Sequence, residues 1–111
     1  MRQANAGPTK AGLAHRERWI AYHCSESLFV NTIEFRDGAP YPDLGCNFET
    51  FTNEEMLEVE ALGPLAELLP GASTEHTEHW ELFSGVPAPP TDEDAIAEWI
   101  APWLHRAGLG V

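Results

Sequence analysis

The chain has 111 residues, 43% of them hydrophobic, which is enough for a single domain with its own core. Eighteen Asp and Glu against six Lys and Arg give a net charge of -12, which opposes binding to phosphate backbones and anionic lipid surfaces. We therefore expect neither nucleic acid nor membrane as a partner. Because no apolar run resembles a signal peptide or a membrane span, we also expect a cytoplasmic protein.

Residues 1–14 hold small and polar residues without periodicity, which predicts a flexible tail, or an extension tied to a partner, ahead of a single domain at residues 15–111. Two runs rich in aromatic and β-branched residues follow, Trp19–Cys24 (WIAYHC) and residues 28–35 (LFVNTIEF), and they predict a β-hairpin. His23 shares a strand face with Trp19, so we expect a structural hydrogen-bonding residue there rather than a ligand.

A second hairpin is predicted where two alternating runs, residues 46–51 and 56–62, flank the polar sequence TNEE. If Phe51 and Met56 close the loop, Glu49 lies opposite Glu58 on a polar face, and Asn47 lies opposite Glu60. Like charges directly opposite each other destabilise a sheet. The pair therefore predicts a ligand, a cation, a nearby base or a shared proton, and a raised carboxyl pKa.

The chain after this hairpin predicts a short helical turn at residues 65–69 and a further strand at residues 74–83, TEHTEHWELF. Strand alternation places His76 and Trp80 on one face and His79 on the other. The two histidines therefore do not converge, and we expect no metal site. The alternative is a hard or borderline ion held by Glu49 and Glu58 with one histidine. We expect no cofactor. Cys24 and Cys46 each lie in a strand-like run, where two free thiols are expected.

The C-terminal region predicts an amphipathic helix. Thr91 is the expected N-cap, acidic residues follow in the first turn, and Pro102 is expected to kink the helix or to restart it as a short second turn. An apolar stripe at helical spacing is expected to cover a sheet of the same chain; its members are Ile96, Trp99, Ile100, Trp103 and Leu104. The elements together predict a mainly β chain with one C-terminal helix.

The run YPDLGCNFETFTNEEMLEVEALGPLAELLPG, followed by HTEHWELF and the Pro-rich approach to the helix, resembles the C-terminal part of an uncharacterised bacterial family related to galactose mutarotases. The resemblance implies part of a large antiparallel β-sandwich that binds carbohydrate in an open cleft. It also implies that Glu58, with Glu60 as runner-up, matches the glutamate that removes the anomeric hydroxyl proton. The family's acid is a histidine far upstream, and only His76 is a weak candidate to replace it.

Two functions follow as alternatives. The first is a carbohydrate-interacting domain without full aldose 1-epimerase activity, which would bind a monosaccharide or similar ligand through Glu49, Glu58, Glu60 and Asn47, while Tyr41 or Trp80 stacks on a sugar face. The second is a non-enzymatic oligomeric module derived from a truncated mutarotase-like fold. Since about five strands and one helix leave a sheet without its usual neighbour, we expect a homodimer or a higher homo-oligomer.

Overall fold

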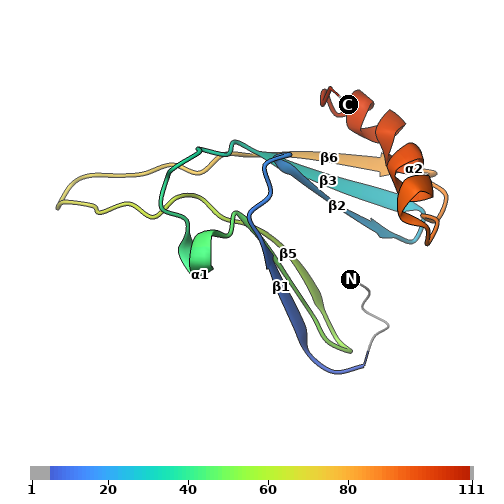
Figure 1. The fold of residues 1–111 in the computed structure, drawn as a ribbon, viewed down its shortest axis with the longest axis horizontal. Coiled ribbons are helices and arrows are strands. Elements are labelled where there is room, and N and C mark those ends of the chain that lie inside the picture. Colours follow the sequence, from blue (N-terminus) through green and yellow to red (C-terminus); the bar gives the residue numbers. More distant parts are fainter. Residues whose placement is uncertain (1–5, 111) are drawn as a thin grey trace. The chain divides into compact units, whose positions relative to one another are not determined.

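The computed structural model describes residues 6–110 and is mainly β with a C-terminal helix, which confirms the predicted fold class (Figure 1). The strands are β1 (Thr9–Leu13), β2 (Trp19–Cys24), β3 (Ser27–Ile33), β4 (Phe48–Thr52), β5 (Leu57–Ala61) and β6 (Glu78–Ser84). The helices are α1 (Pro42–Gly45) and α2 (Glu93–Arg106). Two three-stranded sheets have the strand orders β1-β4-β5 and β2-β3-β6. Over the described range, no helix combines the length and apolar character needed to cross a membrane.

The chain divides into two compact units, and neither is a continuous stretch of sequence. The first unit is made of Met1–Ile20 and Thr32–Glu78, and the second of Ala21–Asn31 and His79–Val111. The chain passes from one unit to the other within β2, β3 and β6. The first unit contains the whole β1-β4-β5 sheet, and the second contains α2.

The strand β1 corrects the prediction of a tail over residues 1–14. It pairs antiparallel with β4, from Thr9 opposite Thr52 to Leu13 opposite Phe48. Its sequence, TKAGL, lacks the alternation that marks a strand, and its side chains are mostly exposed. Pairing with β4 therefore decides its conformation, as is usual for edge strands with little intrinsic β propensity. The first five residues of the predicted tail lie outside the described part of the chain.

The β4–β5 hairpin has the predicted strands but not the predicted register. Glu49 lies opposite Glu60, and Phe51 lies opposite Glu58. The prediction of Glu49 opposite Glu58 was therefore wrong by two positions, and because strand side chains alternate, both glutamates of β5 stay on the face of Glu49. Asn53 explains the shift: its side-chain Oδ1 accepts hydrogen bonds from the backbone N–H groups of residues 55 and 56, at 2.9 and 2.8 Å.

A further backbone bond completes this turn. The N–H of Asn53 donates to the carbonyl of Met56 at 3.0 Å, which leaves only Glu54 and Glu55 in the loop. The Asx interaction thus contracts a predicted four-residue loop to two residues. Met56 therefore lies opposite Asn53 rather than Phe51, a shift of two residues along β4, and the pairs from Thr52 opposite Leu57 onward follow from it.

The second unit has a core made between its strands and α2. Ile100 and Leu104 of the predicted apolar stripe are buried, as are Leu28, Val30, Phe83 and Val86. The ring of Trp103 lies 5.5 Å from that of Phe83, and the ring of Trp99 lies 5.9 Å from that of His23. His23 Nε2 is 2.9 Å from the Val86 carbonyl oxygen, in keeping with the predicted structural role.

The ends of α2 differ in one detail from the prediction. Asp92, not Thr91, is the N-cap, and its carboxylate accepts a hydrogen bond from the N–H of Ala95 at 3.0 Å. An aspartate in this position satisfies a free N–H group and also favours the positive end of the helix dipole. The helix continues through Pro102 to Arg106 rather than restarting there.

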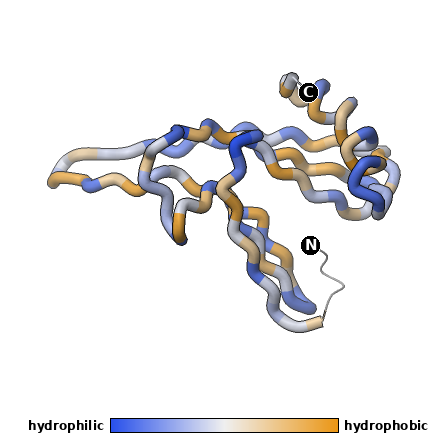
Figure 2. The backbone as a smooth tube through the Cα atoms, viewed as in Figure 1, coloured by the Kyte–Doolittle hydropathy of each residue, from blue (hydrophilic) through white to orange (hydrophobic). Residues whose placement is uncertain are grey.

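The segment between β5 and β6, residues 62–77, is an extended arm (Figure 1). It contains no helix, so the predicted turn at residues 65–69 is wrong, and the following strand begins at Glu78 rather than at residue 74. Residues 65–77 are all exposed, and the first leg of the arm is partly hydrophobic (Figure 2). Leu65, Leu68 and Leu69 are more than half exposed. Pro64 and Pro70 disfavour regular structure here.

Candidate functional site

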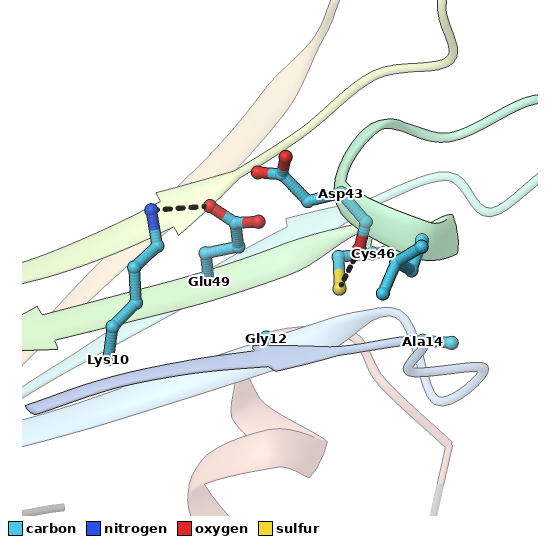
Figure 3. A pocket seen from close by; sticks show the side chains of 7 residues that line it. Lys10, Gly12, Ala14, Asp43, Cys46 and Glu49 are labelled. Atoms are coloured by element: carbon cyan, nitrogen blue, oxygen red, sulfur yellow. Dashed lines mark hydrogen bonds and ion pairs between the residues drawn. The ribbon is translucent and has the colours of Figure 1, made fainter.

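A solvent-open pocket in the first unit is the candidate site, and its walls come from β1, β4 and the α1 turn (Figure 3). Its volume is about 630 Å³. The lining residues are Lys10, Gly12, Ala14, Asp43, Leu44, Cys46 and Glu49. Because β1 and β4 are paired, Lys10, Gly12 and Glu49 share one face of the sheet.

The α1 turn bounds the pocket in an unusual backbone conformation. Asp43 and Leu44 have φ values of 50° and 65°, and Gly45 has φ 97°. Left-handed conformations are costly for residues other than glycine and persist where the surroundings hold them. Cys46 closes the turn: its N–H donates to the Pro42 carbonyl at 2.9 Å, and its Sγ donates to the Asp43 carbonyl at 3.1 Å.

The floor of the pocket depends on a close approach between Gly12 and Cys46. A Cβ atom added at Gly12 would lie 2.6 Å from Cys46 Sγ, a separation that real Cβ atoms do not tolerate. Glycine at this position therefore leaves room for the thiol. Both cysteines are free, as predicted: Cys24 is exposed and Cys46 is half-buried.

Glu49 is the central charged residue of the pocket. It is only 4% exposed, and its Oε2 lies 3.2 Å from Lys10 Nζ. The carboxyl group of Asp43 faces it from the α1 turn (Figure 3). Hydrogen bonding between the two carboxyl groups raises the pKa of Glu49, while Lys10 acts in the opposite direction. The hydrogen bond with Glu49 in turn raises the pKa of Lys10.

A second carboxyl pair lies on β5, next to the pocket. The pKa of Glu60 is raised first by a hydrogen bond with Glu58 and then by burial. The sequence predicted a coupled carboxyl pair with a raised pKa on this sheet face, but it predicted the wrong partners. Glu49 is hydrogen-bonded to Asp43, and Glu60 is hydrogen-bonded to Glu58. In each pair the neighbouring carboxyl group favours the protonated form of its partner, which raises the pKa of that partner.

Two of the predicted sugar-binding residues are instead buried in structural contacts. The ring of Tyr41 is stacked on Phe35 at 5.2 Å, and its hydroxyl accepts a hydrogen bond from the N–H of Arg36 at 2.9 Å. Asn47 is fully buried and bonds the backbone of His15 in both directions, at 2.6 and 2.8 Å. Neither side chain is open to a ligand.

The remaining predicted residues lie away from the pocket walls. His76 Nε2 is 3.2 Å from Glu78 Oε1, and its ring lies against Gly63 at the base of the arm. Trp80 is on β6, 69% exposed, with its ring 5.6 Å from that of Phe29. Neither residue lines the pocket that contains Glu49.

Lys10 and Asp43 are the pocket residues that sequence reasoning missed. Lys10 lay in the predicted tail, and no role was predicted for Asp43. A usable signal was the glycine at position 12, because a glycine between Lys10 and Leu13 is typical of a strand that another group approaches closely. Within residues 6–110, no group of three or more His, Cys, Asp or Glu side chains is arranged to hold a metal ion.

Comparisons of the chain with models of known protein families, with curated proteins and with solved structures found no match. The structure itself defines the class: a small acidic β protein with a C-terminal helix and a pocket that combines one lysine with two carboxyl groups.

Proposed function

We propose that the chain is a carbohydrate-interacting domain that binds a monosaccharide or a similar polyhydroxylated ligand in the Lys10–Asp43–Glu49 pocket. The observation that supports this proposal is the combination of one cationic donor and two carboxyl groups on the wall of a single open pocket. Sugar hydroxyls both donate and accept hydrogen bonds, and sites for small polar ligands are built from a few such convergent groups.

The pocket chemistry favours neutral polyols over anionic ligands. Asp43 and Glu49 outnumber the single lysine, and the whole chain carries a charge of -12. A carboxylate or phosphate on the ligand would be repelled by this field. The pocket contains no aromatic ring on which a sugar could stack, so we expect weak binding.

A titration followed by heteronuclear NMR tests the proposal. Glucose and galactose should move the amide resonances of residues 10–14 and 43–49 in a saturable way. Glu49→Gln should weaken the response, whereas the matched change Glu55→Gln, in the exposed turn of the hairpin, should not. Saturable shifts confined to other parts of the chain, or none up to about 50 mM sugar, well above the millimolar range of weak binding, would contradict it.

The assembly module is a second candidate, and a different observation favours it. Three leucines of the arm, together with Trp80 and Leu82 of β6, are exposed to solvent. Exposed apolar segments of this kind mark interaction surfaces in soluble proteins. This candidate predicts self-association and requires no ligand in the pocket.

A further inference from the structure

The strand β6 combines three features of a pairing edge. It is the last strand in the order β2-β3-β6, so within residues 6–110 it has a strand neighbour on one side only. Five of its seven residues are exposed. Trp80 and Leu82 are 69% and 73% exposed, although large apolar side chains are usually kept off free edges.

The two faces of β6 have different chemistry. Trp80 contacts Phe29, and strand alternation places Leu82 on the same side. Phe83 contacts Trp103 of α2, so alternation places His79 and Glu81 on the side of the helix. In the middle of this strand, Trp80 and Leu82 therefore share one face, and His79 and Glu81 share the other.

We propose that β6 is a homodimer interface, in which the β6 strands of two copies pair antiparallel about a two-fold axis centred on Trp80. This register places Trp80 opposite the partner's Trp80 and His79 opposite the partner's Glu81. Because of the two-fold symmetry, the contact between His79 and the partner's Glu81 is made twice. The inference rests on the assembly function above and identifies its surface.

Charge complementarity favours a second copy of the chain as the partner of β6, and it also favours this register. A symmetric pair centred on Glu81 would place two glutamates opposite each other, which destabilises a sheet. A register centred on Trp80 instead places the imidazole of the partner's His79 opposite each Glu81. An imidazole can donate an N–H to a carboxylate in both its neutral and its protonated form. An aromatic pair then lies at the centre, where such pairs favour association. At a net charge of -12, a self-complementary contact is what allows two copies to approach.

Sedimentation velocity of the full chain tests the proposal, over about 1 to 100 µM protomer because dimer populations depend on concentration. Wild type should dimerise. His79→Glu creates two facing Glu–Glu pairs and should raise the dimer dissociation constant about tenfold. The double variant His79→Glu with Glu81→Lys restores opposite charges and should recover wild-type dimerisation. Ala97→Glu, on the exposed side of α2, is the matched control for added charge.

The outcomes separate this inference from the assembly function. If His79→Glu weakens the dimer no more than Ala97→Glu does, or if the double variant does not recover dimerisation, pairing through β6 is overturned. Self-association would still stand in that case. A monomer throughout would overturn both. Hydrogen exchange of wild type gives a test without variants: the amides of residues 78–84 should exchange more slowly at high than at low protein concentration, and equal rates would also overturn the pairing.

Discussion

Glu49 on β4 lies directly opposite Glu60 on β5, so two like charges face each other in the middle of a three-stranded sheet. Glu49 is hydrogen-bonded to Asp43 and Lys10, and Glu60 to Glu58 and to Glu49 itself, so neither carboxyl group lacks a hydrogen-bond partner.

Removing the second charge of this facing pair should stabilise the chain. Glu60→Gln keeps the shape of the side chain and leaves one carboxyl charge fewer on the sheet face that it shares with Glu49 and Glu58. We expect the free energy of unfolding at neutral pH to rise by about 0.5 kcal/mol, the scale of a cross-strand charge pair. Urea denaturation measures it, with Glu55→Gln in the exposed turn as the control. A lower stability for Glu60→Gln would mean that the charge at this position is structurally required.

The raised pKa of Glu49 predicts a pH dependence with a definite sign. The folded chain holds this proton more tightly than the unfolded chain, whose carboxyl pKa is near 4.5. The resulting stability is present below that value and is lost as the pH rises through the raised pKa. Thermal melts should therefore show wild type losing stability above pH 4.5 relative to Glu49→Gln. Parallel curves for the two proteins would show that Glu49 has an ordinary pKa.

The close approach of Gly12 to Cys46 predicts a coupled pair of substitutions. Gly12→Ala places a methyl group against the thiol and should cost about 1 to 3 kcal/mol in the free energy of unfolding, as overpacking usually does. Cys46→Ala removes the sulfur, so the double variant should recover most of the loss. Additive effects in this double-mutant cycle would show that the two side chains do not compete for space.

Asn47 should behave as a structural residue. Its amide satisfies both backbone groups of His15 in a fully buried position. Asn47→Ala leaves those groups without partners and should reduce the free energy of unfolding by about 2 kcal/mol. The sugar response of the folded fraction should be unchanged, as NMR titration would show. A loss of response without loss of stability would return Asn47 to the binding site.

The resemblance to mutarotases leads to a prediction about chemistry. Anomer interconversion needs a base and an acid within reach of one sugar. The candidate acid, His76, is hydrogen-bonded to Glu78 and lies outside the pocket. Since one such group typically contributes about 10² to 10⁴ in rate, the chain should not accelerate mutarotation of α-glucose or α-galactose in a polarimeter. Acceleration proportional to protein concentration and abolished by Glu58→Gln would contradict this.

The predictable parts of the fold are those that local sequence controls. The amphipathic stripe from Ile96 to Leu104 predicted α2, and alternation predicted which glutamates share a face of the β4–β5 hairpin. The register was not predictable from alternation, because a shift of two residues preserves the faces. It depends on the Asx turn at Asn53.

The pocket was less predictable because its residues are distant in sequence. Lys10 meets Glu49 only because β1 pairs with β4, and nothing in the sequence TKAGL predicts a strand. Asp43 faces the pocket because three successive residues of the α1 turn have positive φ, and two of them are not glycine. Glu49 was identified from its pattern, but its partners were determined by tertiary structure.

The way the chain crosses between its two units limits how the protein can be divided. Each crossing lies inside a strand rather than in a loop, and each unit needs two separated stretches of sequence. No single truncation of the gene therefore yields either unit alone. A shortened chain that keeps residues 1–78 would contain every residue that lines the pocket but would lack one of the two stretches from which the second unit is built.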